Sequence, residues 1–478
     1  MGAIGGVRAG SKARSGAGPS APVSPEPRRR RGIRRSATAI GVAVLAVALL
    51  VVGGLGPFHR GADVDRTTVL GTDPAGSLED HPVVLSGSLQ QAIASLQARL
   101  QQIPQDADSW ATLGLAYVQE ARVTADPSYY PKAEGALRRS LQIEPSNNFV
   151  ADTGMGALAA ARHDFTGALS WGEQAREINP YNGNVYGVIG DAQVELGRYD
   201  DAFATFQHMV DVKPDLASYA RASYARELQG DLASARDDMQ LALDAAGNPE
   251  DRAFAASQLG DLAFNSGDPA RAKFFYTEAT VDAPEYMPPR AGLARVAWAG
   301  GDVAGAIEQF SDIVGAYPLP EYVIALGDLD TVAGRPRDAA AQYATVRVEE
   351  RLFAAAGVDV DLELALFDAD HGNPARAVRE ATEEWHRRHS ILVADALGWS
   401  LYRDGRAAEA LRYARFANQL GYRNALLKFH AGMIERATGH TAAAIRDLGL
   451  ALEYNPHFSI LYADTARRTL DALQREDA

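Results

Sequence analysis

The residues best suited to bind a metal ion are His386 and His389, which stand three residues apart in the stretch WHRRH. Residues at this spacing share one face of a helix, so both imidazoles could reach the same ion. Two arginines stand between them, however, and their positive charge opposes the binding of a cation. We therefore interpret this stretch as a solvated helix end.

A second candidate, Asp368 with Asp370 and Gly372, has the spacing of the first half of a calcium-binding loop. Such a loop needs a bidentate glutamate at its twelfth position, where this chain has Arg379. We interpret the stretch as a solvated turn. The sequence also lacks the HExxH, GxSxG and glycine-rich phosphate motifs. It therefore predicts no catalytic site, no metal and no cofactor, and we do not expect an enzyme.

The charge of the chain is divided unequally between its N-terminus and the remainder. Residues 1–58 hold nine Lys and Arg against one acid, which gives them a charge of +8. Since the net charge of the chain is −14, the other 420 residues carry −14 − 8 = −22. An acidic body is poorly suited to neutralise phosphates, and we expect no nucleic-acid partner. The 478-residue chain contains no cysteine, which excludes disulfides and thiol chemistry.

The first 87 residues divide into three segments by composition. Residues 1–36 are rich in Gly, Ser, Pro and Arg and predict a disordered basic tail. Residues 37–57 contain no charged residue, and a helix of this length spans about 31 Å, the thickness of the hydrocarbon core of a bilayer. They predict a transmembrane helix. Residues 58–87 show no helical period and predict a linker.

The arginines of residues 28–35 precede the apolar segment, which predicts a cytoplasmic N-terminus and an extracytoplasmic body. The alternative is a cleaved signal peptide, since Arg34 and Arg35 resemble a twin-arginine signal. No convincing small-residue cleavage site follows, so we favour a single-pass anchor in the cell membrane over secretion. In either case the body is exported. The Ala-rich composition, with more Arg than Lys, is typical of a GC-rich bacterial genome.

The stretch from Asn184 to Pro214 is the unit from which most of the chain is built. Its apolar residues recur at helical spacing on both sides of Gly197, which predicts two short helices broken there. Gly190 and Ala202 are small where the two helices must approach closely, and Phe206 fills the space beside them. A pair this short cannot bury its apolar face alone, so it predicts neighbours of the same kind.

The unit recurs ten times with steps of 33 to 38 residues. The small residue of the second helix is, in order, Ala133, Ala168, Ala202, Ala235, Ala272, Ala306, Ala339, Ala377, Ala410 and Ala444. A turn glycine stands five residues earlier in eight copies: Gly197, Gly230, Gly267, Gly301, Gly334, Gly372, Gly405 and Gly439. Ten phased copies predict an all-α solenoid of helix-turn-helix repeats.

The repeats resemble the tetratricopeptide repeat (TPR) family. Trp110, Leu113, Gly114 and Tyr117 match its W-x2-L-G-x2-Y signature. The resemblance covers residues 88–473, with a capping helix expected at each end. It implies antiparallel helix pairs stacked into a right-handed superhelix with a concave groove.

The copy around Ala377 departs most from the pattern, because leucines alternate with acids between Leu362 and Leu366. We still expect a helix there, since Leu362 and Leu366 keep a helical spacing. The joins at 243–252 and 346–358 are longer than the others, and we expect flexing between parts of the array at these joins.

In this family the groove is lined by first-helix positions that face away from the packing residues. The resemblance therefore implies a binding face that can take an extended peptide or a partner helix. Its residues in this chain are Asp191, Glu195, Asp261, Phe264, Arg295, Trp298, Asp328, Trp399, Tyr402 and Arg403. The Lys and Asn clamp that holds C-terminal carboxylates in some relatives is missing, so a chaperone-tail adaptor is not expected.

Three functions are compatible with these features. We favour a non-enzymatic scaffold, tethered to the membrane, whose groove binds a peptide or protein partner. An assembly factor for an exported or membrane complex is the alternative, because the start of the array resembles TPR modules of cytochrome c maturation. An enzyme with a site in the irregular region 346–390 is the third hypothesis.

Overall fold

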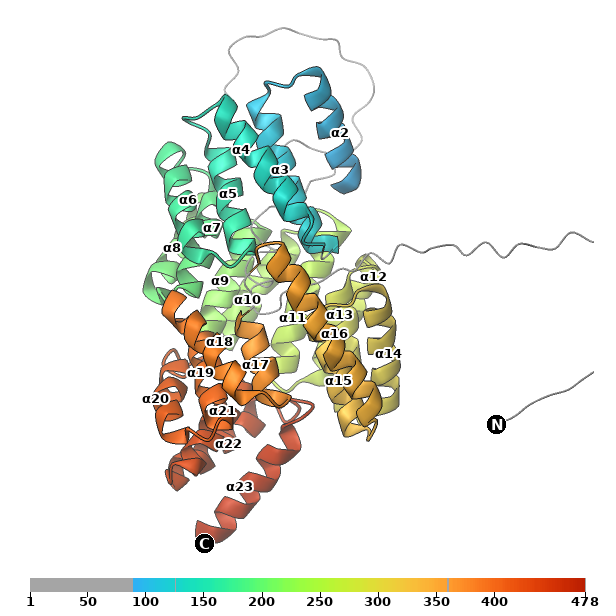
Figure 1. Cartoon of the computed structure of the whole chain (residues 1–478), viewed down its shortest axis with the longest axis vertical. Coiled ribbons are helices and arrows are strands. Elements are labelled where there is room, and N and C mark those ends of the chain that lie inside the picture. Colours follow the sequence, from blue (N-terminus) through green and yellow to red (C-terminus); the bar gives the residue numbers. More distant parts are fainter. Residues whose placement is uncertain (1–88, 125, 359–360, 478) are drawn as a thin grey trace, which may run out of the picture. The chain divides into compact units, whose positions relative to one another are not determined.

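The computed structural model describes residues 89–477, except 125 and 359–360 (Figure 1). In this part of the chain all regular structure is α-helical, with 22 helices and no strand. The predicted tail, transmembrane helix and linker lie outside the described residues and stay predictions. No helix in the described part combines the length and the apolar character needed to cross a membrane.

The helices form ten consecutive antiparallel pairs, each of which is one repeat. The first helices are α3 (Ala107–Thr124), α5 (Phe149–Ala161), α7 (Gly183–Glu195), α9 (Leu216–Leu228), α11 (Pro249–Asn265), α13 (Met287–Ala299), α15 (Pro320–Val332), α17 (Asp361–Asp370), α19 (Ile391–Arg403) and α21 (Ala425–Ala437). The second helices are α4 (Tyr129–Ile143), α6 (Phe165–Ile178), α8 (Tyr199–Val212), α10 (Leu232–Asp244), α12 (Pro269–Asp282), α14 (Val303–Ala316), α16 (Pro336–Ala355), α18 (Pro374–Arg387), α20 (Ala407–Ala417) and α22 (Thr441–Tyr454). The predicted ten pairs are confirmed.

A single helix flanks the pairs at each end: α2 (Leu89–Gln102) before them and α23 (Ala463–Asp477) after them. Ile93, Leu96 and Leu100 of α2 are spaced three and four residues apart and are buried. Ile103 follows the end of this helix at Gln102 and is 47% exposed. Both single helices occupy the capping positions that the sequence predicts.

The close approach within each pair is confirmed in the third repeat. Ala202 and Phe206 are fully buried, and a Cβ atom on Gly190 would lie 2.3 Å from the ring of Phe206. All eight predicted turn glycines have φ between 73° and 104°, the left-handed region in which a side chain is strained. In the second repeat His163 holds the same position with φ 63°.

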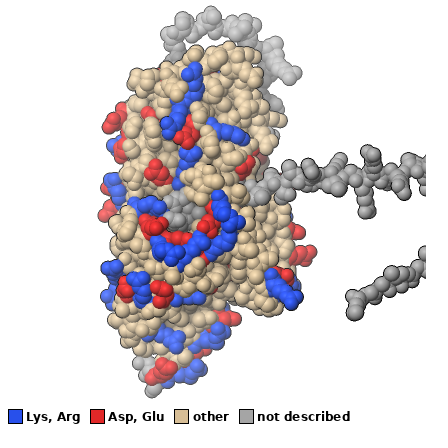
Figure 2. Space-filling model, viewed as in Figure 1, with Lys and Arg blue, Asp and Glu red and all other residues tan. Residues whose placement is uncertain are grey.

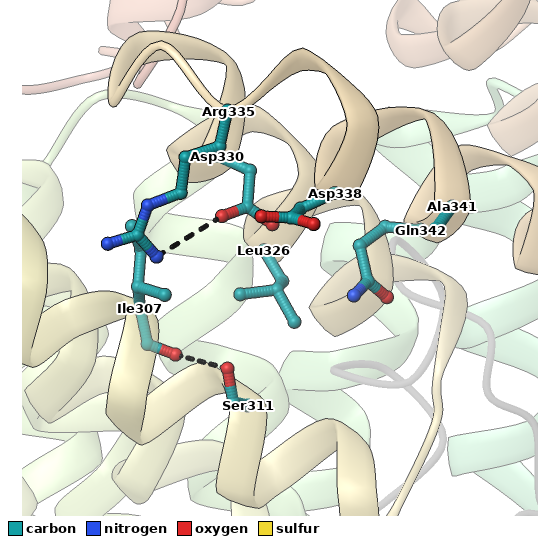
Figure 3. A pocket seen from close by; sticks show the side chains of 8 residues that line it. All are labelled: Ile307, Ser311, Leu326, Asp330, Arg335, Asp338, Ala341 and Gln342. Atoms are coloured by element: carbon teal, nitrogen blue, oxygen red, sulfur yellow. Dashed lines mark hydrogen bonds and ion pairs between the residues drawn. The ribbon is translucent and has the colours of Figure 1, made fainter.

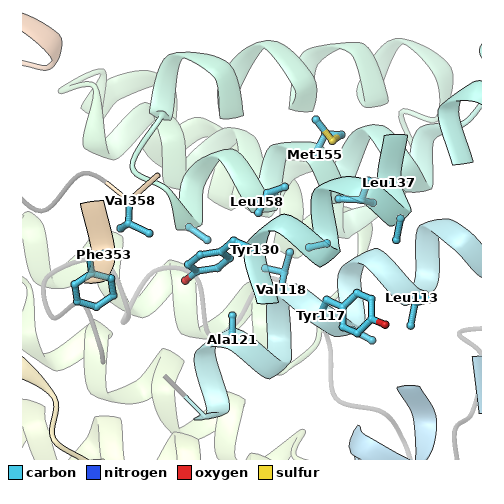
Figure 4. Close-up of a cluster of buried hydrophobic side chains, with 14 of the residues drawn as sticks. Leu113, Tyr117, Val118, Ala121, Tyr130, Leu137, Met155, Leu158, Phe353 and Val358 are labelled. Atoms are coloured by element: carbon cyan, nitrogen blue, oxygen red, sulfur yellow. The ribbon is translucent and has the colours of Figure 1, made fainter. Parts of the chain in front are cut away.

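The irregular copy around Ala377 is an ordinary helix pair, as expected from its helical spacing. The join at 346–358 differs from the expectation of a longer connection, because residues up to Ala355 continue α16 as a 20-residue helix. No proline stops the chain there, and the apolar residues keep a helical period to Phe353. The extension buries Phe353 and Val358 (Figure 4) in a cluster with Val118, Ala121 and other residues of the first two repeats.

Repeats five apart in the chain contact each other. Tyr317 at the end of repeat 6 donates a hydrogen bond to the carbonyl of Arg122 in repeat 1, at 3.5 Å. At the end of repeat 7, Gly357 lies beside the guanidinium of Arg162 from repeat 2. At the junction of repeats 8 and 9, the backbone N–H of Ile391 donates to the hydroxyl of Tyr199 in repeat 3 at 2.7 Å.

The same offset continues through the last repeats. A Cβ atom on Gly230 in the turn of repeat 4 would lie 2.5 Å from the carbonyl oxygen of Gly421 after repeat 9. One on Gly267 in the turn of repeat 5 would lie 3.0 Å from that of Tyr454 at the end of repeat 10. We call this series of contacts, from Arg122–Tyr317 to Gly267–Tyr454, the seam. It joins the turn of each of the first five repeats to the end of the fifth repeat after it.

Candidate partner-binding face

The ten residues predicted to face the groove lie on the first helices of their repeats, from α7 to α19. Asp191 on α7 is buried and forms a bidentate ion pair with Arg221 on α9, at 2.8 Å and 2.7 Å. The two side chains are 4% and 2% exposed. Because both partners are removed from water, this pair joins neighbouring repeats and leaves Asp191 unable to reach a ligand.

Glu195, four residues further along α7, belongs to the seam. Its carboxylate accepts a hydrogen bond from Arg388, which follows α18 and also donates to Glu384. All three side chains are at most 4% exposed, and the guanidinium of Arg388 lies 4.7 Å from the ring centroid of Phe165. Residues 193 positions apart are thus held together by one buried arginine.

Asp261 and Arg295 form the next polar group, on α11 and α13. Arg295 donates to Asp261 at 2.6 Å, and Tyr276 donates to the same carboxylate at 2.7 Å. The guanidinium also lies 5.2 Å from the ring centroid of Phe264, which is buried. Arg295 keeps 35% of its side-chain exposure and Asp261 keeps 23%. This pair is therefore accessible, and the buried ring of Phe264 packs against the guanidinium.

Asp328 on α15 accepts a hydrogen bond from Tyr343 at 2.9 Å and lies 3.4 Å from Nε2 of His371. Burial raises the pKa of Asp328 to about 7 and lowers the pKa of His371 to about 4. At neutral pH the imidazole is therefore uncharged, while the carboxyl group exchanges its proton with solvent near that pH. The two rings of Tyr343 and His371 lie against each other, with centroids 4.1 Å apart.

Asp370 at the end of α17 organises the last part of the face. It accepts hydrogen bonds from Trp399 at 2.7 Å, Tyr462 at 2.6 Å and Arg403 at 3.3 Å. Arg403 also donates to the hydroxyl of Tyr462 at 2.6 Å. The segment after Pro456 therefore lies against the side chains of α17 and α19. Trp399 is buried here, whereas Arg403 keeps 28% of its exposure.

Two aromatic residues complete the face. Tyr402 is half-buried and stacks on Trp399, with ring centroids 5.1 Å apart. Trp298 on α13 is also half-buried, and His457 meets it edge-on with centroids 6.0 Å apart. Both indole and phenol rings keep exposed area that a partner could cover.

Glu227 and Tyr286 show that parts of this region are enclosed. Both side chains keep partial exposure, yet burial is the largest cause of the shift in their pKa values. Burial and the nearby Asp261 carboxylate raise the pKa of Glu227 to about 7. Burial therefore favours the uncharged form of both side chains.

The two stretches first considered for metal binding do not form a metal site. His386 and His389 are both exposed. The interpretation of Asp368 and Asp370 as part of a solvated turn is wrong, because both lie in α17 and Asp368 is buried in ion pairs with Arg347 and Arg376. Across residues 89–477, apart from the gaps, no three His, Asp or Glu side chains are grouped so that they could hold a metal ion.

A small depression lies between α14, α15 and α16 (Figure 3). Ile307 and Leu326 form its apolar part, and Arg335 lies 3.8 Å from Asp330 at its edge. Its volume is about 230 Å³, below the range of about 300–1,000 Å³ that small-molecule sites usually occupy. Size therefore argues against a cofactor or metabolite in this depression.

Part of the repeat array is similar in sequence to a known family. The tetratricopeptide repeat profile matches residues 188–249 and 257–319, which are helices of repeats 3 to 6. In these two stretches the chain matches the tetratricopeptide repeat. The matched region includes four of the turn glycines, Gly197, Gly230, Gly267 and Gly301, and the small alanine that follows each of them.

Several solved structures are similar to this chain at low identity. A thermophilic TPR protein of Thermus thermophilus is 20% identical, with 40% of this chain and 98% of that chain covered and a TM-score of 0.35. The human IFIT1 dimer with m7Gppp-AAAA is 14% identical, with 70% and 77% covered and a TM-score of 0.44. PilW, a type IV pilus biogenesis factor, is 16% identical, with 44% and 94% covered and a TM-score of 0.36. No curated protein matches the chain.

The ten predicted residues of the TPR face fall into two groups. Four are buried, and in this structure they support the face: Asp191, Glu195, Phe264 and Trp399. Six keep partial exposure, and their contact with a partner stays a prediction: Asp261, Arg295, Trp298, Asp328, Tyr402 and Arg403.

Asp370, His371 and Tyr462 contact residues of this face, and we did not predict them from the sequence. Asp370 stands seven residues before Ala377, the position that Arg403 holds in the next repeat, so the repeat register could have identified it. Tyr462 has no such signal. It lies beyond the last repeat, and only the folded chain brings it to Asp370.

Proposed function

We propose that this chain is a non-enzymatic interaction scaffold whose inner TPR face binds a segment of a protein partner. The observation that carries the proposal is the row of partly exposed charged and aromatic side chains on consecutive first helices, from Asp261 to Arg403. Arginine, tyrosine and tryptophan are the residue types that contribute most to binding at protein interfaces. In this chain four such residues of the row lie on α13 and α19: Arg295, Trp298, Tyr402 and Arg403.

The proposal includes the absence of a nucleic-acid partner. On the side of the molecule shown in Figure 2, Lys and Arg side chains lie beside Asp and Glu side chains. The 420 residues after residue 58 carry a charge of −22. A polyanion would meet repulsion from such a body.

The inner face can be tested with paired aromatic substitutions. We expect Trp298→Ala combined with Tyr402→Ala to reduce recovery of the partner at least tenfold, because two interface aromatics typically contribute more than about 1.4 kcal/mol together. Partners would be captured by cross-linking of the full-length chain in intact cells and quantified by mass spectrometry.

The matched control replaces two exposed aromatics outside the face, Phe274 and Tyr181, which are 60% and 85% exposed. This pair should leave recovery unchanged. If the Trp298→Ala, Tyr402→Ala variant recovered as much partner as the unsubstituted chain, the proposed site would be refuted. If only the control variant lost the partner, binding would lie on the outer surface.

We further propose that residues 37–57 anchor the chain in the cell membrane with the repeats outside. The chain has no cysteine, so single cysteines can report topology with a membrane-impermeant maleimide. In intact cells we expect Gly135→Cys, on the exposed side of α4, to be labelled. Ser11→Cys should react only after lysis. Labelling of Ser11→Cys in intact cells would contradict this orientation, and its loss from the mature chain would indicate cleavage and secretion.

A further inference from the structure

The second half of α16 contributes side chains to the buried cluster of the first two repeats. Val346, Glu349 and Phe353 stand three and four residues apart, so they share one face of the helix. Val346 and Phe353 belong to the same buried cluster as Tyr130 and Leu158 (Figure 4). The helix thus presents two apolar side chains with a carboxyl group between them.

Glu349 is buried without compensation. It is 1% exposed, and neither of its carboxyl oxygens has a hydrogen-bond partner within the described part of the chain. An ionised carboxylate in such a place loses its hydration and gains nothing in return, so the closed seam favours the protonated group.

The charged groups around Glu349 increase this effect. From α15, the Glu321 carboxylate repels a charge on Glu349, and burial together with that repulsion raises the pKa of Glu349 to about 8. Tyr317, which follows α14, lies in the fields of both Glu321 and Glu120 of α3. Among the described residues, no cation lowers the pKa of Glu349 in return.

Two arginines of this region pair with other carboxylates. Arg347, on the same helix, pairs with Glu350 and Asp368. Arg162, which meets the end of α16, pairs with Glu134.

We propose that Glu349 is a pH-sensitive latch: loss of its proton to solvent releases the second half of α16 from repeats 1 and 2 and opens the seam there. The proposal is independent of what the inner face binds. Glu349 would make the packing of α16 depend on pH at a place where an apolar side chain would suffice for the fold.

The direction of the pH effect follows from linkage. In the open state the carboxyl group is hydrated and has its ordinary pKa of 4.5, whereas in the closed state its pKa is about 8. The closed state therefore holds the proton more tightly, is favoured at low pH and is weakened as the pH rises toward 8. Between pH 6 and pH 8 the ratio of open to closed molecules should rise about 50-fold.

The test uses a fluorescent donor and acceptor on the full-length, cysteine-free chain, at Gly135→Cys on α4 and Ala354→Cys on α16. Both positions are exposed. Energy transfer should fall as the pH rises from 6 to 8.5, while the far-ultraviolet circular dichroism of the helices stays constant. Glu349→Gln, which keeps the shape but cannot ionise, should hold the transfer at its pH 6 value throughout.

Asp338→Asn provides the matched control, because it removes an exposed carboxylate from the same helix. It should respond to pH as the labelled parent does. Constant transfer in the parent from pH 6 to 8.5 would overturn the proposal. An unchanged pH response in Glu349→Gln would also overturn it, since another group would then control the seam.

Discussion

Replacing Arg388 by leucine should lower the free energy of unfolding by about 3–5 kcal/mol, because removing one member of a buried ion pair leaves an uncompensated charge. Glu195 and Glu384 would both lose the guanidinium that they share, and each of these acids is at most 4% exposed. Arg387→Leu is the matched control. Arg387 also pairs with Glu384, but it is 44% exposed, so its loss should cost no more than about 1 kcal/mol.

Urea denaturation followed by circular dichroism measures both variants, and hydrogen exchange locates the loss. Faster exchange in Arg388→Leu should appear in α7 and α18, which the arginine joins. The double variant Glu195→Leu, Arg388→Leu should recover part of the stability, because it removes one buried charge together with its partner. Equal losses in Arg387→Leu and Arg388→Leu would show that the seam contact does not contribute as the structure indicates.

Replacing Gly197 by alanine should destabilise the chain more than the same change at Gly405. Both residues have left-handed backbones, with φ of 76° and 80°, so a side chain costs about 1 kcal/mol at either position. At Gly197 the new Cβ would lie 2.3 Å from the carbonyl oxygen of His389, while at Gly405 it would meet nothing within 4 Å. Overpacking of this kind adds about 1–3 kcal/mol.

The comparison separates two uses of the same turn glycine. We expect the denaturation midpoint of Gly405→Ala to fall slightly and that of Gly197→Ala to fall by two to four times as much. Gly230→Ala should resemble Gly197→Ala, since its Cβ would lie 2.5 Å from the carbonyl oxygen of Gly421. Equal shifts in the three variants would mean that only the local backbone matters and that the seam yields without cost.

The seam also limits how a partner can reach the inner face. Glu195 lies in the seam and Asp191 beneath a neighbouring arginine, so a ligand cannot pair with either of them without displacing an internal cation. The accessible side chains lie further along the chain, from Asp261 to Arg403. This distribution is why we place the proposed interaction on repeats 5 to 9.

The sequence by itself determined the helices, their pairing and the turns between them. These features depend on residues close in the chain, such as Gly190, Ala202 and Phe206, and residues of similar size recur at this spacing in most copies. The left-handed turns were predictable for the same reason, because glycine is the residue that such a backbone favours.

Only the tertiary structure decided which side chains of the first helices remain available. Asp191 is neutralised by an arginine 30 residues away and Glu195 by one 193 residues away. The second contact requires the small rotation between successive repeats to accumulate over five of them, and no local pattern in the sequence specifies that sum. For this reason the repeat register could predict a face, whose contact with a partner stays a prediction, while it could not predict the seam that buries part of that face.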